Sequence, residues 1–302
     1  MTTVGIRHLS FTLGDQRVSY RELPDIEQRI RELNIPDDEE LWNWGYCRRS
    51  SKDYPAFIVD GCGELFASLA AAGIEIDAVL GCAPLHNSTE RFMAALRSGV
   101  VPELAGSGER LRCVSDRDCV NVLQALADAR DLIRSGCRHV LIMAAEKVED
   151  ERSRFRKYSV FSDFCLALVV SGQLEHCEYE IVDVQIRVDP RPGEDTSGIL
   201  TRNLEKECVA GLLAEHGVAA AEISRFFYLN LFQPIAEMKA MHTGFAASQI
   251  YTAATKEIGH CYGADPFINM RTDLATGGGG HTYALCASGR GHAGAALVRR
   301  LR

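Results

Sequence analysis

Residues 114–148, VSDRDCVNVLQALADARDLIRSGCRHVLIMAAEKV, carry the clearest secondary-structure pattern in the chain. Apolar side chains recur there at helical spacing: Cys119, Val122, Leu123, Leu126, Ala129 and Ile133. Gly136 ends this pattern, and residues 138–145 (RHVLIMAA) form a continuous apolar run typical of a strand buried on both faces. The stretch therefore predicts a turn, a long helix that begins near Cys119, and a buried strand.

The same alternation of helix and strand extends toward both ends of the chain. Apolar residues at helical spacing predict a helix over 57–72, which Gly73 can end because glycine tolerates a left-handed backbone. A buried strand is predicted within 74–84, a short helix over 90–97 and a further apolar strand over 164–171 (FCLALVVS). Helices that alternate with continuous apolar strands indicate a layered α/β architecture.

The pattern changes beyond residue 172. Residues 178–188 (EYEIVDVQIRV) alternate like a strand, helical stretches follow around 201–215 and 234–257, and four glycines at 277–280 predict a flexible turn. The chain closes on a small-residue strand pair, YALCASGRGHAGAALVRR (283–300). Two parts of similar size, 1–172 and 173–302, are therefore predicted.

The composition excludes several classes of protein. The 302 residues are 46% hydrophobic and 25% charged, and the net charge is −8, which disfavours non-specific binding to nucleic acid or anionic membrane. No apolar stretch approaches the roughly 18 residues of a membrane helix, and the N-terminus lacks the pattern of a signal peptide. We therefore expect a soluble, cytoplasmic, globular protein.

Eleven cysteines are scattered along the chain without the Cys-x-x-Cys spacing of zinc or redox motifs. No set of His, Asp and Glu has metal-ligand spacing, and no glycine-rich phosphate loop of the dinucleotide or Walker type is found. We therefore expect no metal and no permanently bound cofactor. Most of the cysteines are expected to be small buried hydrophobic residues.

Cys119 differs from the other cysteines in its surroundings. It lies at the predicted start of a helix, where free backbone N–H groups and the helix dipole favour a thiolate. A strand, a sharp turn and a helix also form the geometry that exposes a nucleophile at the edge of a sheet. The alternative is a small buried residue that begins a core helix.

An ordered set of motifs resembles the β-ketoacyl-ACP synthase III group of thiolase-fold enzymes. In that group an acidic residue and a reactive Cys precede a helix ending in Ser-Gly, then a strand and Ala-Glu; the matching positions are Asp116 or Asp118, Cys119, Ser135, Gly136, Ala145 and Glu146. Residues 161–171 resemble the family's Phe-Gly-Asp-Gly-Ala-Gly-Ala strand with its glycines replaced, and 286–298 resemble its closing Gly-x-Gly pair. The resemblance spans nearly the whole chain. It implies a five-layered αβαβα fold of two pseudo-duplicated halves, and a homodimer.

Two segments that resemble the family's catalytic loops carry exchanged residues. SRFFYLNLFQPI (224–235) has Asn230 where the family has its His, and IGHCYGADPFIN (258–269) has His260 where the family has its Asn. The resemblance implies that both side chains face Cys119 and donate hydrogen bonds to an oxyanion or enolate. Backbone N–H groups near Ser288 and Gly289 could do the same. Alternatively, His260 is a polar loop residue and Asn230 a hydrogen-bonding residue at a strand end.

Asp265 follows His260 closely and could orient its imidazole, unless it is only a turn residue before Pro266. A Cys–His–Asp set would make His260 a better general base and favour acyl transfer to oxygen or nitrogen. A His–Asn pair without the carboxylate would instead favour decarboxylative carbon–carbon condensation. The sequence leaves both open.

Arg152, Arg154 and Arg156 precede the 161–171 strand, where the resemblance implies a cofactor tunnel. They could bind the phosphates of coenzyme A or of a carrier phosphopantetheine, or lie in a solvated loop. The resemblance thus implies an acyltransferase: Cys119 accepts an acyl group from an acyl-CoA or acyl carrier protein thioester and passes it to a second substrate in a specialised, natural-product pathway. A non-catalytic thiolase-fold partner subunit is the alternative, because the family's His and glycines are replaced.

Overall fold

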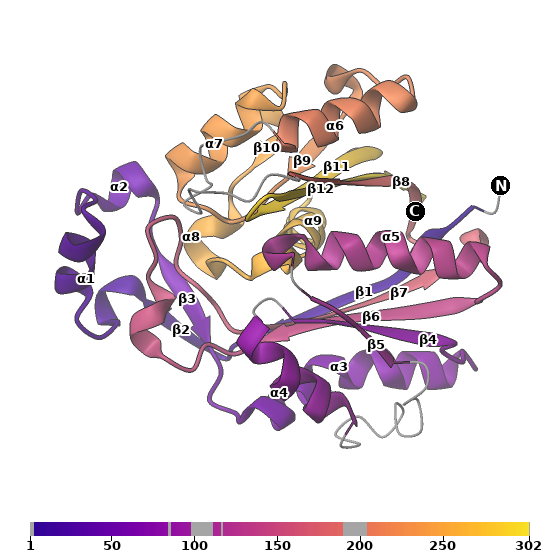
Figure 1. The fold of residues 1–302 in the computed structure, drawn as a ribbon, viewed down its shortest axis with the longest axis horizontal. Coiled ribbons are helices and arrows are strands. Elements are labelled where there is room, and N and C mark those ends of the chain that lie inside the picture. Colours follow the sequence, from indigo (N-terminus) through magenta and orange to yellow (C-terminus); the bar gives the residue numbers. More distant parts are fainter. Residues whose placement is uncertain (1–2, 84–85, 98–110, 116, 190–203, 302) are drawn as a thin grey trace.

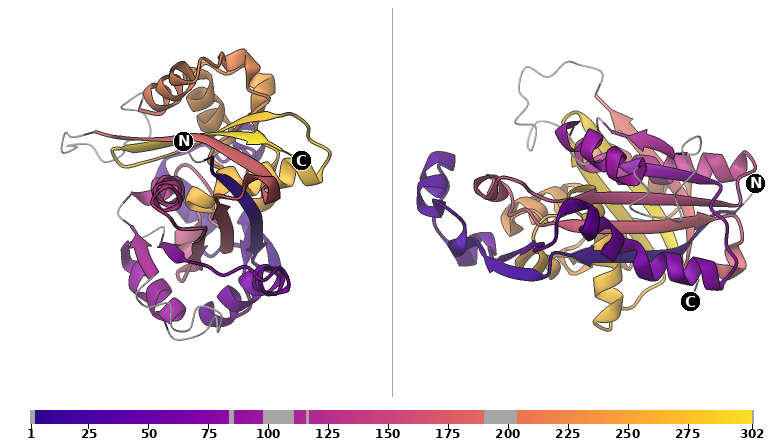
Figure 2. Two further views of the ribbon diagram at one scale, coloured as in Figure 1. Left: turned by 90° about the vertical axis from the view of Figure 1, so that its right-hand side faces the viewer. Right: turned by 90° about the horizontal axis from the view of Figure 1, so that it is seen from below.

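The computed structural model describes residues 3–83, 86–97, 111–115, 117–189 and 204–301. Across these residues ten strands follow one another in the order β5 (Leu111–Val114), β4 (Ala78–Cys82), β6 (His139–Glu146), β7 (Phe164–Ser171), β1 (Gly5–Leu13), β8 (Tyr179–Val188), β12 (His292–Arg300), β11 (Thr282–Gly289), β9 (Arg225–Phe227) and β10 (Ile250–Tyr251). Two residue pairs, Gly5–Glu180 and Ile6–Tyr179, join β1 to β8. Beyond this short contact the first five strands and the last five strands of this order diverge, and helices lie between them (Figures 1 and 2).

Helices form three layers around these strands (Figure 1). The layers are α3 (Tyr54–Ala71) and α4 (His86–Arg97) outside the first five strands, α5 (Asn121–Arg134) and α9 (Asp265–Ala275) between the halves, and α6 (Leu204–Glu215) and α7 (Gln233–His242) outside the last five strands. The central α5 contacts β6 on one side and β8 and β12 on the other. The observed arrangement is the five-layered αβαβα architecture predicted from the sequence.

Local sequence explains where the predicted elements begin and end. The carboxylate of Asp53 accepts a 2.8 Å hydrogen bond from the N–H of Ala56 and caps α3, and Gly73 follows the helix with a left-handed φ of 62°. Strands β6 and β7 are buried along their whole length, as their continuous apolar runs predicted. Among the described helices, none is both long enough and apolar enough to cross a membrane.

The region after α7 differs from the prediction. The pattern predicts one helical stretch over 234–257, but α7 ends at His242, because Gly244 takes a φ of 98° that no helix continues. The short β10 and α8 (Ala254–Ile258) follow. Helix α9 was not predicted, since glycine and proline surround its start; Pro266 occupies its first turn, where no N–H partner is required.

A small subdomain, residues 16–49, lies beside the main sheet near one end of α7 (Figure 1). It contains β2 (Gln16–Ser19), α1 (Ile26–Leu33), α2 (Glu39–Trp42) and β3 (Tyr46–Arg49). Its own core is aromatic: the Trp44 ring lies 5.0 Å from Phe155 and 5.4 Å from Phe232, measured between centroids. Because Phe155 and Phe232 come from different halves of the chain, this aromatic cluster connects the subdomain to both halves.

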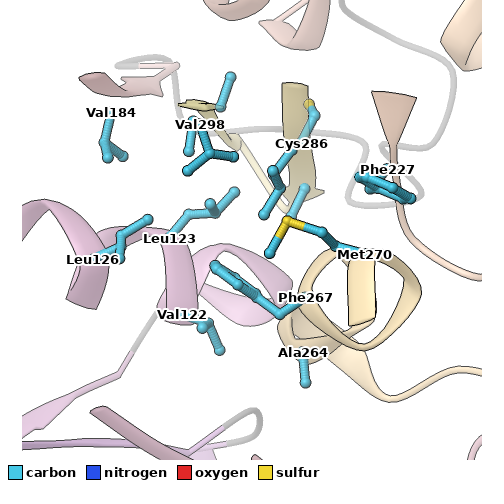
Figure 3. Close-up of a cluster of buried hydrophobic side chains, with 14 of the residues drawn as sticks. Val122, Leu123, Leu126, Val184, Phe227, Ala264, Phe267, Met270, Cys286 and Val298 are labelled. Carbon is cyan, nitrogen blue, oxygen red and sulfur yellow. The ribbon is translucent and has the colours of Figure 1, made fainter. Parts of the chain in front are cut away.

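The space between the halves is filled by apolar side chains of the two central helices (Figure 3). Leu123 of α5, Phe267 and Met270 of α9, and Val298 of β12 are fully buried together. This packing fixes α5 relative to α9. The 3₁₀ turns in front of the two helices, Asp118–Val120 and Tyr262–Ala264, consequently contact each other.

Candidate active site

Cys119 lies in the turn that leads into α5, within the single 3₁₀ turn Asp118–Val120. Asp118 adopts a left-handed φ of 47°, and its carboxylate accepts a 3.1 Å hydrogen bond from the backbone N–H of Arg290. Gly289 permits this approach, because a Cβ there would lie 2.7 Å from the Cβ of Asp118. The hairpin of β11 and β12 therefore holds the sharp turn that presents the thiol.

His260 lies next to this thiol, with its Nε2 3.6 Å from the Sγ of Cys119. Its backbone is fixed on both sides: its N–H donates to the Val160 carbonyl at 2.7 Å, and its carbonyl accepts from the Ser162 N–H at 3.0 Å. Gly263 brings the following turn close, since a Cβ there would lie 2.3 Å from the Cys119 carbonyl oxygen. The imidazole is thus held where it can exchange a proton with the thiol.

Asp265 lies behind the imidazole and is completely buried. One carboxylate oxygen, Oδ2, makes a short hydrogen bond with His260 Nδ1 and also accepts from the backbone N–H of Asn230 at 2.7 Å. The other, Oδ1, accepts from the backbone N–H of Cys261 at 2.7 Å. The structure therefore brings Cys119, His260 and Asp265 together in a Cys–His–Asp arrangement in which the carboxylate orients the imidazole.

Asn230 is also buried, but its amide is directed toward Asp265. The side-chain nitrogen donates to the Gly259 carbonyl at 2.8 Å and to Asp265 Oδ1 at 3.3 Å, and the side-chain oxygen accepts from Asn269 Nδ2 at 2.9 Å. Both N–H groups of this amide are therefore used behind the imidazole. This placement differs from the sequence-based expectation of an oxyanion donor beside Cys119, because the amide is aimed at the carboxylate of Asp265.

Asn269 is a buried polar residue that the sequence did not indicate as part of the site. It sits on α9, the helix that the sequence pattern did not predict, and its side chain is completely buried. Its Nδ2 donates to the Tyr228 carbonyl at 3.0 Å and to the side chain of Asn230. One sequence signal was available: a helix beginning at Asp265 places residue 269 one turn later on the same face.

Burial raises the pKa of the Cys119 thiol well above its usual range, and the carboxylates of Asp118 and Asp265 raise it further. The helix start predicted from sequence favours the thiolate, so the structure reverses the expected direction. Loss of water around the sulfur disfavours the charged thiolate. The resting thiol is consequently protonated at neutral pH and needs a base to ionise. Asp116, the other acidic candidate in this turn, lies outside the described residues.

Aromatic rings form the walls around the imidazole of His260. Phe161 packs edge-on at 4.8 Å between ring centroids, Tyr262 lies at 5.4 Å and Tyr158 at 6.4 Å. Burial raises the pKa of Tyr158 to about 12, so its phenol stays protonated and can donate a hydrogen bond. These walls limit water around the imidazole and strengthen its interaction with Asp265.

The three predicted phosphate-binding arginines have separate partners. Arg154 is completely buried and forms an ion pair with Asp163 (2.8 Å), which raises the pKa of its guanidinium further. Arg152 is exposed and lies 3.4 Å from Asp25, and Arg156 donates to the Ser153 carbonyl at 2.8 Å. Arg154 therefore presents no guanidinium face to a phosphate, which corrects the expectation for that residue. Arg152 and Arg156 remain available at the surface.

Replacing Arg154 by alanine is expected to lower the free energy of unfolding by about 3–5 kcal/mol, because Asp163 would keep a buried charge without its partner. Urea denaturation followed by circular dichroism measures this change. Arg152→Ala is the matched control, and its exposed position predicts a change within about 0.5 kcal/mol. Equal losses for the two variants would contradict the structural role assigned to Arg154.

One group of side chains away from this site has the geometry to hold a metal ion. In the described part of the chain, ligand atoms of Asp183, Glu215 and His216 lie within 4.8 Å of one another. Asp183 is already paired with Arg130 and, at 3.1 Å, with His216. A cation would have to displace the guanidinium, so the contacts favour an ion-pair cluster.

The sequence matches no protein-family model, and no curated protein matches it by sequence. Solved structures do match, over almost the whole chain. The acyltransferase ChlB3 has a TM-score of 0.78 and 18% identity, covering 99% of this chain and 98% of that one. The 3-oxoacyl-(acyl carrier protein) synthase III of Pseudomonas aeruginosa PAO1 has a TM-score of 0.74, 15% identity and 99% coverage of both chains. AbyA1, a tetronic acid condensing enzyme, has a TM-score of 0.72 and 17% identity, covering 98% of this chain and 100% of that one.

The chain has the thiolase fold. This confirms the fold implied by the resemblance in the sequence. In the thiolase fold of this protein, the Cys119 turn and the His260 loop meet between the two halves, at the N-terminal ends of the central helices α5 and α9. At 15–18% identity the likeness establishes the fold. The reaction has to be argued from the side chains.

Proposed function

We propose that this protein is an acyltransferase that forms an acyl-thioester intermediate on Cys119. The observation that carries the proposal is the Cys119–His260–Asp265 arrangement, with Sγ and Nε2 3.6 Å apart and Nδ1 bonded to the carboxylate. The acyl donor is a thioester of coenzyme A or of a carrier-protein phosphopantetheine. The likeness in fold to an acyltransferase and to condensing enzymes supports this assignment.

The first half-reaction uses His260 as base and then as acid. Nε2 takes the thiol proton of Cys119, and the thiolate attacks the donor's carbonyl carbon, forming a carbon–sulfur bond and an oxyanion. Collapse of the oxyanion breaks the donor's own carbon–sulfur bond, and the leaving thiolate takes the proton from Nε2. Asp265 stabilises the imidazolium between these events and does not itself become protonated.

The second half-reaction repeats the cycle with the acceptor. An acceptor hydroxyl or amine gives its proton to His260 Nε2 and attacks the carbonyl carbon of acyl-Cys119. The bond to Sγ breaks, and the thiolate recovers the proton from the imidazolium. The products are an ester or amide and the regenerated thiol, so no oxidant and no further reactant is needed.

The arrangement favours an oxygen or nitrogen acceptor over carbon–carbon condensation. An enolate formed by decarboxylation needs two hydrogen-bond donors near the sulfur, and Asn230 directs its amide to Asp265 and Gly259 instead. The buried carboxylate orients the His260 imidazole so that Nε2 can accept a proton, which is what deprotonation of an acceptor requires. We infer transfer to a hydroxyl or amine.

Intact mass spectrometry after incubation with a series of acyl-CoA thioesters tests the proposal. We expect one acyl group per chain, located on the Cys119 peptide and on none of the other ten cysteines. Adding an alcohol or amine should discharge the adduct without release of CO₂. Discharge only by a malonyl thioester, with CO₂, would make the protein a condensing enzyme; no adduct on any cysteine would make it a non-catalytic subunit.

We further propose that the enzyme is a homodimer, acts in the cytoplasm and serves a specialised biosynthetic pathway. Support for the pathway comes from the exchange that the sequence resemblance implies at Asn230 and His260, and from the likeness in fold to AbyA1, a tetronic acid condensing enzyme. Sedimentation equilibrium distinguishes a dimer from a 33.2 kDa monomer.

A further inference from the structure

Two buried asparagines extend the candidate triad away from Cys119. Asn230 is 1% exposed and Asn269 is 0% exposed, and their amides form a continuous chain of hydrogen bonds to Asp265. The chain runs from Asn269 Nδ2 to Asn230 Oδ1, and from Asn230 Nδ2 to Asp265 Oδ1. Buried amides in such a network are costly unless their partners are present, so these contacts are mutually dependent.

The orientation of both amides follows from their partners. The Tyr228 carbonyl can only accept, so the Asn269 amide nitrogen must face it at 3.0 Å. The second N–H of that nitrogen meets the side chain of Asn230, which must therefore present its oxygen. The Asn230 nitrogen consequently faces Asp265 and the Gly259 carbonyl, and each of its two N–H groups has an acceptor.

We propose that Asn230 is a positioning residue for acyl transfer, which holds the Asp265 carboxylate against His260 while Asn269 locks the Asn230 amide in place. This inference rests on the proposed function, since it assigns Asn230 a role in the same site. It replaces the role of oxyanion donor with one exerted through Asp265.

The contacts of Asp265 explain why a donor is required at this place. A completely buried carboxylate stays charged only if donors surround it, and three of its contacts come from outside the imidazole: the N–H groups of Cys261 and Asn230 and the side chain of Asn230. The side-chain amide is the one contact that a substitution can remove. Without it, Oδ1 keeps a single donor and the carboxylate can turn away from Nδ1.

Asn230 also restrains the loop that carries the base. Its Nδ2 holds the carbonyl of Gly259, the residue before His260. Gly259 has a φ of 72°, and a Cβ there would lie 2.6 Å from the Val160 carbonyl oxygen. Glycine is therefore required for this left-handed backbone and its close contact. One amide therefore fixes both the carboxylate and the backbone on either side of the imidazole.

The test compares Asn230→Ala with Gln249→Ala. Gln249 is a matched control, because its amide also holds two backbone carbonyls, those of Ala220 and Ile223, but far from the thiol. We expect Asn230→Ala to slow the acylation of Cys119 by about 10- to 100-fold, the size of effect that misplacing a catalytic group by 1 Å can produce. Gln249→Ala should acylate at the wild-type rate.

A second measurement needs no acyl donor. The pH at which iodoacetamide alkylates Cys119 at half its maximal rate should shift in Asn230→Ala. The Asp265 carboxylate raises the pKa of the thiol directly and stabilises the imidazolium that pairs with the thiolate, so displacing this carboxylate changes both effects. The other titratable and charged groups that act on Cys119 or on the tyrosines beside it are unchanged by the substitution: Asp118, Glu146, Arg156, Tyr158, Tyr262 and Arg290. Gln249→Ala should keep the wild-type midpoint.

A double variant, Asn230→Ala combined with Asp265→Asn, distinguishes a positioning role of Asn230 from a general loss of structure. If Asn230 acts through Asp265, adding Asn230→Ala to Asp265→Asn should cost less than about 3-fold in acylation rate, well short of additivity. An undiminished loss in that background, or a wild-type alkylation midpoint in Asn230→Ala, would overturn the proposal. If no variant and no wild-type protein forms an acyl adduct, the proposed function fails, while the alkylation midpoints still judge the positioning role.

Asn230→Asp keeps the inference testable if the alanine variant does not fold. The carboxylate is nearly isosteric with the amide, and its charge faces Asp265. Two carboxylates at this distance cannot both ionise easily, so the variant can donate a hydrogen bond only while it is protonated. The rate of Asn230→Asp relative to wild type should therefore fall as the pH rises. A constant ratio between pH 5 and 9 would overturn the proposal.

Discussion

Replacing Cys119 by alanine is expected to abolish the acyl adduct and to lower acyl transfer by at least about 10⁴-fold. The remaining groups can bind a thioester and polarise its carbonyl, but they offer no atom that forms a covalent intermediate. Single-turnover transfer from a labelled acyl-CoA to an alcohol or amine, quenched and separated by chromatography, measures the loss. Thermal unfolding should change little, because a small, partly exposed side chain is shortened by one atom.

Cys137→Ala provides the control for this experiment. Cys137 is also partly exposed, but it lies at the opposite end of α5, in the turn that follows Gly136. It should retain wild-type transfer. A Cys119→Ala protein that still carries an acyl group, or that transfers within 10-fold of wild type, would show that the covalent step proceeds elsewhere.

Replacing His260 by alanine is expected to slow acylation of Cys119 by about 10³- to 10⁴-fold at pH 7. The reason lies in the thiol: burial raises its pKa, so without the base the protonated form dominates at neutral pH. Stopped-flow measurement of thiol release from an acyl-CoA gives the rate. His242→Ala, on an exposed turn at the end of α7, should leave it unchanged.

The pH dependence of His260→Ala provides a second, sharper check. A thiol whose pKa is raised gains thiolate about tenfold for each pH unit below that pKa. The logarithm of the acylation rate in His260→Ala should therefore increase with unit slope through pH 9, without a plateau. A plateau near pH 7 would mean that another group ionises the thiol, and His260 would lose its assigned role.

Much of the fold could be predicted from short-range patterns. Strand β7 has the bounds that its apolar run indicates, and α5 continues from the turn at Cys119 with the predicted apolar face buried. Gly73 ends its helix for a reason that involves only its own backbone. By contrast, α7 was predicted too long, because its end depends on a glycine conformation that periodicity does not report.

The sequence indicated several residues of the candidate site, but it did not indicate the hydrogen bonds and ion pairs that these residues make. Cys119, His260 and Asp265 were selected from a turn signal and an ordered resemblance, and the structure brings them together. The amide of Asn230 faces Asp265 because α9 places Asn269 behind it. Arg154 pairs with Asp163 because the turn before β7 folds back on the strand. Neither arrangement has a signature in local sequence.

The sequence alone determined that this is a layered α/β protein with one cysteine at a helix start, because hydrophobic periodicity and turn residues act over a few positions. The tertiary structure determined the partner of that cysteine and the burial of its thiol. Its His260 partner is 141 residues away, and burial in the folded chain raises the pKa of the thiol, whereas a helix start alone is expected to lower it. Desolvation depends on everything packed around an atom, and hydrogen bonds depend on where side chains point, so both emerge only when the two halves meet.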